Sequence, residues 1–273
     1  MRYLVGVDGS APSDAALTWA ATRARRDGVA LVVIHVVESD AGRRESGIAL
    51  DPDDFGRRLL ETARSRLRAE APALEVHTEL RHGSPSWSLT RLAHPDDVLV
   101  VGTHKTGFSS GRVLGSLSVQ IAAASSCTVA VIPATDLRFR RGVVAGIDRD
   151  ETARHIADLA AREAVARNEE LTLVHAGRPA DGSGVDGNGV EDSPLRTALD
   201  HVRATYPQLT VLARRSNRPP SAALLDTARS KALLVIGPGS TDARSPIRTV
   251  VHEVLLNANA PVLVAGAPVV APA

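Results

Sequence analysis

An internal repeat runs through the 273 residues of this chain. Three pairs of segments match, the first two at an offset of 140 residues and the third at 135: Val5–Ser10 with Ala145–Asp150, Leu31–His35 with Leu171–His175, and Val98–Gly102 with Leu233–Gly237. A last pair, Thr128–Val131 with Pro261–Val264, stands at an offset of 133. A repeat of this kind predicts two homologous domains. We place them at residues 1–138 and 139–273, with the boundary in the polar, basic stretch from Thr135 to Arg141.

Within each half, short β-branched runs alternate with segments of helical spacing, which predicts βαβ units and a parallel sheet. The expected strands of the first half are Tyr3–Asp8, Leu31–Val37, Val76–Arg81, Val98–Gly102 and Cys127–Pro133. Helices are expected from Ser13 to Asp27, where Gly28 would cap the end, and from Asp54 to Ala71. We predict an α/β fold of two tandem, doubly wound, five-stranded parallel sheets in the strand order 3-2-1-4-5. The stretches Ser39–Asp53 and Gly177–Ser193 are predicted loops, the second of them mobile.

Composition excludes several classes of function. Lysine and arginine number 32 against 31 acidic residues, a net charge of +1, so the chain lacks the basic field of a nucleic-acid-binding protein. The single cysteine, Cys127, cannot form an internal disulfide and stands at the start of an apolar run, which indicates a buried, inert thiol. No apolar run approaches the ~18 residues of a membrane span, and the first residues do not form a signal peptide, so we expect a cytoplasmic protein without a membrane partner.

The residues best suited to bind a ligand follow the first and fourth predicted strands. In an open doubly wound sheet, ligands bind at the carboxyl ends of the strands where the strand order reverses. Asp8 ends the first strand before a tight turn, and the fourth strand ends at Gly102, where a glycine would let a ligand approach the backbone. A helix is expected to begin at Gly115–Ser116, so its free amides and the serine hydroxyl form a candidate phosphate site, to which Lys105 could add charge.

These residues resemble the universal stress protein family. The resemblance rests on Val5–Ser10, on His35, and on Gly102 followed thirteen residues later by Gly115–Ser116, and it covers both halves. It implies a Rossmann-like stress-response regulator that binds ATP or a related adenine nucleotide, with or without magnesium. The nucleotide site implied in the first half comprises Val7, Asp8, Val36, Gly102, His104, Lys105, Gly115 and Ser116. Lys105 replaces the second glycine of the family pattern, and the residues leave open whether it adds charge to the phosphates or fills the pocket.

The second half departs further from the family pattern. Residues Ile247–Thr249 stand where a glycine and serine should open the helix, and the two-residue deletion shortens the same loop. We predict that this half has lost its nucleotide site, and that Asp148 remains because its side chain satisfies neighbouring amides of the turn. The two domains are expected to pair through their last strands, Thr128–Ile132 and Pro261–Val264, as an internal pseudo-dimer. Further homodimerisation and protein partners stay open.

Other readings are weaker. His35 and His175 recur at the same place in both halves and are predicted to be core residues, whereas His104 lies in the candidate phosphate loop. The nine histidines form no zinc pattern, and no catalytic residue is predicted, although weak ATP hydrolysis stays open. Ser109 lies in a Gly-x-Ser-x-Gly pattern that starts five residues after the strand ends, unlike a hydrolase elbow. The serious rival is a tandem stress protein that binds no nucleotide and acts as a protein-interaction scaffold.

Overall fold

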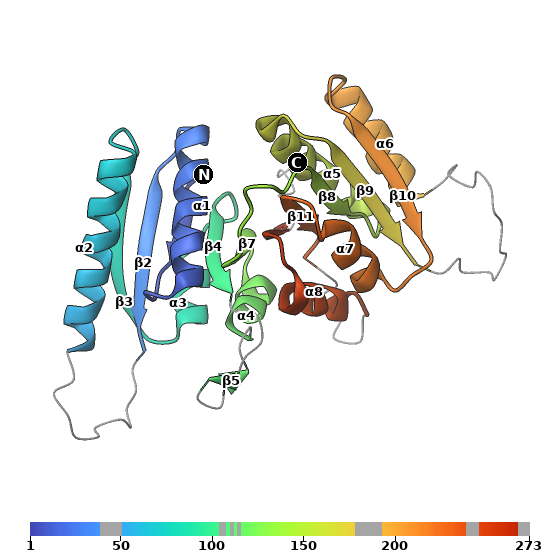
Figure 1. The fold of residues 1–273 in the computed structure, drawn as a ribbon. Helices are drawn as coiled ribbons and strands as arrows, with labels where there is room; N and C mark the ends of the chain where they lie inside the picture. Colours follow the sequence, from blue (N-terminus) through green and yellow to red (C-terminus); the bar gives the residue numbers. More distant parts are fainter. Residues whose placement is uncertain are drawn as a thin grey trace, which may run out of the picture. The chain divides into compact units, whose positions relative to one another are not determined.

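The computed structural model describes residues 1–38, 51–103, 108–109, 112–113, 116–177, 193–238 and 246–266 (Figure 1). For residues 108–109, 112–113, 116 and 246–249 it describes the backbone alone. The contacts divide the chain into two compact units, unit 1 (Met1–Ala134) and unit 2 (Thr135–Ala273). No helix among the described residues is both long and apolar enough to cross a membrane.

Unit 1 is a doubly wound domain. Its main strands and helices are β1 (Tyr3–Gly6), α1 (Ala11–Asp27), β2 (Leu31–Val37), α2 (Pro52–Glu70), β3 (Val76–His82), α3 (Pro85–Leu92), β4 (Val98–Thr103), α4 (Ser116–Ala124) and β7 (Thr128–Pro133). The strands are all parallel and stand in the order β3-β2-β1-β4-β7, which confirms the predicted 3-2-1-4-5 order. Between β4 and α4 the chain forms a short antiparallel hairpin, β5 (Phe108–Ser109) with β6 (Arg112–Val113), that the sequence did not predict.

Unit 2 repeats this architecture. Its elements are β8 (Val143–Gly146), α5 (Asp150–Arg167), β9 (Leu171–Ala176), α6 (Pro194–Thr205), β10 (Val211–Ser216), α7 (Pro220–Ala228), β11 (Leu233–Ile236), α8 (Pro246–Asn257) and β12 (Val262–Val264). The parallel order is β10-β9-β8-β11-β12, again 3-2-1-4-5. Because crossovers between parallel strands are right-handed, the helices after the first two strands cover one face and the next two cover the other. The packing of α5 on α6 and of α7 on α8 agrees with this arrangement.

The sequence sets the ends of α1. Ser10 caps its start by accepting a hydrogen bond from the Ser13 amide, so the helix begins two residues earlier than predicted, at Ala11. Gly28 ends it in the left-handed region (φ 66°), where its amide donates to the Ala24 carbonyl, as predicted. Between these caps, small alanines on the buried face let the helix lie close to the sheet.

The central strands are buried on both faces, as parallel strands covered by two helix layers must be. The edge strands carry charged residues; β3 is half-buried and β10 is largely exposed. An ion pair between the partly exposed Arg2 and the buried Asp97 fixes the start of β1. The guanidinium of Arg2 lies 2.7 Å from the Asp97 carboxylate, which also accepts hydrogen bonds from the Arg2 and His94 amides.

Cys127 is 2% exposed and forms no disulfide, as the sequence predicted. Burial raises the pKa of its thiol to about 11.

The two units differ most in the helix after the second strand. The C-terminal turns of α2 and α6 correspond, because the amides of Ala71 and Tyr206 donate to the equivalent carbonyls of Leu67 and Val202. However, α2 has 19 residues and α6 has 12. Measured from this shared end, the described helix α6 therefore begins seven residues later than α2 does.

Candidate functional site

The strand order reverses between β1 and β4 in unit 1. These strands pair side by side, with Tyr3 opposite Val98 and Val5 opposite Val100, while β1 also pairs with β2. Their connections leave the sheet in opposite directions, so their carboxyl ends border a crevice. This crevice is where the sequence predicted a ligand.

A hydrogen-bonded turn carries the chain from β1 into α1. The Asp8 side chain accepts a hydrogen bond from the Ser10 amide (2.9 Å), and the Asp8 amide donates to the Ser13 hydroxyl (3.3 Å). The Ser13 hydroxyl in turn donates to the Ser10 carbonyl (2.9 Å). Gly9 between them has φ +81°, which an L side chain adopts only with strain. The carboxylate of Asp8 is thereby held at the exposed end of the strand.

The packing of α1 constrains the residue at position 102 to glycine. A Cβ at this position would lie 2.4 Å from the carbonyl carbon of Pro12 and 2.7 Å from the amide nitrogen of Ser13. The close approach of the first turn of α1 therefore requires a glycine here. Gly102 still lines the crevice, but its lack of a side chain is explained by packing.

His35 is a core residue with a defined hydrogen bond. Its Nδ1 donates to the carbonyl of Val7 (2.8 Å), and its ring packs edge-to-face with Phe55 at a centroid distance of 5.8 Å. The side chain ties the end of β2 to the end of β1. His175 makes the equivalent bond to the carbonyl of Ile147 (2.8 Å) in unit 2. Both histidines support the backbone of the crevice, which agrees with their predicted structural role.

A pocket of about 230 Å³ occupies the crevice in unit 1. Four predicted site residues line it: Val7, Asp8, Val36 and Gly102. Leu117, in the first turn of α4, lines the same pocket, so the start of that helix borders the cavity. Ser116 begins α4 as a backbone position, and the predicted His104, Lys105 and Gly115 lie outside the described residues.

Sequence reasoning missed several other residues that line this pocket. Ser10 and Ser13 could have been found, because a serine before a predicted helix is a capping signal that also places hydroxyls at the strand end. Glu38 directly follows β2 and could have been found by the same rule of strand ends. Pro85 and Leu89 of α3 carried no comparable signal, because no motif surrounds them.

Unit 2 retains a cavity at the same place and of the same volume, about 230 Å³. Twelve residues line it, and eleven of them stand at repeat positions that also line the pocket of unit 1. Among these matched pairs are Asp8 with Asp148 and Gly102 with Gly237. The cavity is therefore a shared property of the two halves.

The polar edge of the cavity differs between the units. At the repeat positions of Ser10 and Ser13, unit 2 has Asp150 and Ala153, and neither lines its cavity.

The prediction for Asp148 was wrong in its details. Instead of neighbouring amides, its carboxylate contacts the hydroxyl of Thr152 (3.2 Å) and the guanidinium of Arg149 (3.2 Å). Arg149 stands at the position of Gly9 and has φ −134°, so the two turns have different backbones.

Comparison with known proteins agrees with this architecture. Residues 1–133 match the profile of the universal stress protein family. The universal stress protein Rv2005c of Mycobacterium tuberculosis is 28% identical over 283 aligned residues, covering 96% of each chain. The universal stress protein Rv2623 of the same organism is 25% identical, covering 87% of this chain and 86% of the relative. A crystal structure of a universal stress protein from Archaeoglobus fulgidus superposes over 97% of this chain and 95% of its own, with a TM-score of 0.70 and 17% identity. Unit 1 belongs to the universal stress protein family, and the chain as a whole is similar to universal stress proteins.

Membership confirms the resemblance seen in the sequence. The family profile ends near the end of unit 1, whereas the mycobacterial universal stress proteins align along both units. The likeness to the archaeal structure extends over nearly the whole chain, so the two-unit fold is shared. The site residues of this protein still have to be argued from its own geometry.

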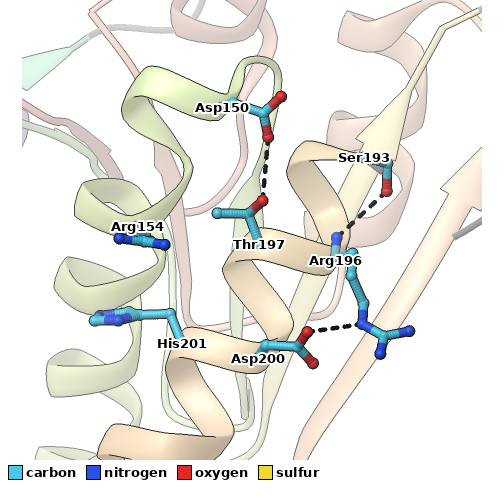
Figure 2. Close-up of a pocket in the computed structure, with 7 residues that line it drawn as sticks. All are labelled: Asp150, Arg154, Ser193, Arg196, Thr197, Asp200 and His201. Atoms are coloured by element: carbon cyan, nitrogen blue, oxygen red, sulfur yellow. Dashed lines mark hydrogen bonds and ion pairs between the residues drawn. The ribbon is translucent and has the colours of Figure 1, made fainter. Parts of the chain in front are cut away.

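A larger cavity, of about 710 Å³, lies between α5 and α6 of unit 2 (Figure 2). Figure 2 shows Thr197 facing Asp150 at the start of α5, and the Thr197 hydroxyl lies 3.2 Å from that carboxylate. On α6, Nε of Arg196 donates to Asp200 (2.7 Å). Both carboxylates in this cavity thus have protein partners. Its lining comes from the two helices and the cap of α6, with no strand end, so we assign it to helix packing and not to the family's crevice.

Proposed function

We propose that unit 1 binds ATP or a related adenine nucleotide and that the protein acts as a nucleotide-responsive regulator of a stress response. The observation that carries this proposal is the pocket at the strand-order reversal, which Asp8, Val36 and the first turn of α4 line together. A pocket with an apolar wall and a few convergent polar groups, beside a helix N-terminus, suits a ligand with a flat apolar ring and an anionic tail.

The charges of the described wall suggest how the ligand lies. Asp8 and Glu38 line the pocket, and no lysine or arginine does so among the residues that the structure describes. Phosphate groups are therefore expected away from these carboxylates, at the start of α4, where unpaired amides and the helix dipole favour negative charge. The carboxylate of Asp8 can accept hydrogen bonds from ribose hydroxyls. When Mg²⁺ accompanies ATP it needs only one or two protein carboxylates, which Asp8 and Glu38 could supply.

Unit 2 is proposed to bind no nucleotide. Its cavity keeps the apolar wall, but a carboxylate, Asp150, stands where unit 1 has the Ser10 hydroxyl at the helix start. At the start of α8, where phosphates would lie in this unit, Arg248 stands at the repeat position of Gly115, so a large side chain replaces the glycine before the helix. The proposal therefore predicts one nucleotide per chain.

Calorimetry with Mg-ATP tests the proposal with a matched pair of variants. Val36→Trp places a large ring in the pocket of unit 1, and Ala176→Trp does the same in the cavity of unit 2; both positions are half-exposed strand ends that can hold the larger side chain. We expect one site in the unaltered protein, loss of binding in Val36→Trp and normal binding in Ala176→Trp. Gly115→Asp, which adds a carboxylate at the helix start, should also abolish binding.

Two results would contradict the proposal. Saturation at two nucleotides per chain, with one lost in each tryptophan variant, would show that unit 2 also binds. Absence of heat with the unaltered protein would favour the rival function, a two-domain scaffold that presents surfaces to protein partners without holding ATP.

A further inference from the structure

The first two turns of α2 form a wall beside the candidate nucleotide pocket. Asp51 caps this helix by accepting a hydrogen bond from the Asp53 amide (3.1 Å). The ring of Phe55 reaches from His35 toward the turn after β1, because a Cβ at Gly9 would lie only 3.7 Å from its Cζ. Phe55 thus stands over the ends of both β1 and β2.

A glycine lets α2 come this close to the sheet. A Cβ at Gly56 would lie 2.6 Å from the Cδ1 of Leu80 and 2.7 Å from the His35 ring. Glycine inside a helix is unfavourable by roughly 1 kcal/mol relative to alanine, so the position needs a compensating reason. Here the reason is close packing, which also fixes where the neighbouring Phe55 ring lies.

This packing leaves part of the Phe55 ring exposed. It is 45% exposed, unlike a core aromatic residue. It lines a cavity of about 370 Å³ together with Pro52, Val36 and Val37. This cavity shares His35, Val36 and Glu38 with the 230 Å³ pocket, so the end of β2 borders both spaces. An apolar, partly exposed aromatic surface therefore continues the wall of the proposed site.

Unit 2 contains no counterpart of this wall among its described residues. Its helix α6 begins at Pro194 and corresponds to the later turns of α2, so no described helical turn of unit 2 carries a counterpart of Phe55. His175, the partner of His35 in the repeat, is accordingly more exposed than His35. The aromatic wall thus occurs in the unit that is proposed to bind nucleotide and has no counterpart in the described part of the other.

We propose that Phe55 packs against the nucleobase of the bound ligand and selects for a planar, aromatic base in unit 1. The inference rests on the proposed nucleotide function and names a residue for it. A base that contacts Val36 on one side would have Phe55 within the adjoining cavity. Every nucleobase has an aromatic face, so this contact favours nucleosides and nucleotides over phosphate compounds that lack a base.

The experiment compares three ligands on the intact chain by calorimetry: Mg-ATP, adenosine and tripolyphosphate. Phe55→Ala should weaken ATP and adenosine by about 5- to 150-fold, the range for removing one aromatic ring that stacks on a base, and leave tripolyphosphate unchanged. Phe55→Trp should restore affinity to within a few-fold, and its indole fluorescence should change when adenosine binds. Phe139→Ala is the matched control, since Phe139 is 91% exposed and lines neither cavity.

The outcomes separate this inference from the function on which it rests. If Phe55→Ala binds ATP and adenosine as tightly as the unaltered protein, or weakens tripolyphosphate equally, Phe55 does not contact the base and the inference is wrong while nucleotide binding stands. If adenosine binds in a Phe55-dependent way but ATP does not bind, the inference holds and the phosphate part of the proposed function fails. If neither ligand binds the unaltered protein, both fail.

Discussion

Gly102→Ala should destabilise unit 1 although it adds only one methyl group at the end of a strand. The new Cβ would lie 2.4 Å from the Pro12 carbonyl carbon and 2.5 Å from its oxygen. Carbon atoms pack at about 3.5 Å or more, so the backbone of the first turn of α1 must move by about 1 Å. Neither neighbour can yield by rotating a side chain, because both are main-chain atoms. Overpacking of this kind costs about 1–3 kcal/mol.

Tryptophan fluorescence during urea unfolding measures this cost in the correct unit, because both tryptophans, Trp19 and Trp87, lie in unit 1. Gly6→Ala is the matched control. Its Cβ would meet the Cδ1 of Leu89 at 3.0 Å, the far end of a side chain that can rotate, so we expect a loss below about 1 kcal/mol. If Gly102→Ala is no less stable than Gly6→Ala, the packing of α1 does not require a glycine at position 102. The approach of a ligand would then be the remaining explanation for this glycine.

Three further predictions concern buried groups. His35→Ala should lower the free energy of unfolding by about 1–3 kcal/mol, because it leaves the Val7 carbonyl without its partner in a buried site. His175→Ala should lower it less, since water can reach the more exposed position. Chemical denaturation followed by circular dichroism compares the two variants. Burial is the largest influence on Asp97 and favours its protonation, but the hydrogen bonds from Arg2 and the His94 amide, with the charge of Arg2, outweigh it and lower the pKa below the usual 3.8. A lowered pKa in the folded state gives stability that is present above pH ~4 and disappears as the pH falls through the folded value, so unfolding between pH 5 and roughly pH 2 should lose part of its pH dependence in Asp97→Asn. The raised pKa of Cys127 keeps its thiol neutral, and a thiol reagent at pH 8 should label it only after denaturation; rapid labelling of the folded chain would refute its burial.

The repeat made most of the fold predictable. Matching segments placed four strands in each half, and the alternation of strands and helices indicated a fifth strand and parallel sheets, which the structure confirms. Features set by neighbouring residues were also predictable: Gly28 caps α1, as its position after the helical segment suggested. The β5–β6 hairpin was missed because each strand has only two residues, too few for a period to be visible.

The site was harder to predict, because it depends on contacts between segments far apart in sequence. Gly102 was recognised as a required glycine, but only the placement of α1 shows that Pro12 is the neighbour that requires it. The same holds for Phe55. Nothing in the spacing of α2 distinguishes an aromatic residue that covers a pocket from one that faces solvent, since the difference depends on the close approach that Gly56 permits.

Comparing the two units distinguishes features that follow from the fold from features that ligand binding would require. Equal cavities at matching positions in both halves show that the crevice follows from strand order, from the glycines that end β1 and β4, and from a leucine on the facing helix. A cavity at this place is therefore weak evidence for binding. Among the described residues, the halves differ in the serine hydroxyls at the first helix start and in the two turns of α2 that carry Phe55. If nucleotide binding is confined to unit 1, these additions account for it; if both units bind, the shared apolar wall with Asp8 and Asp148 must be sufficient.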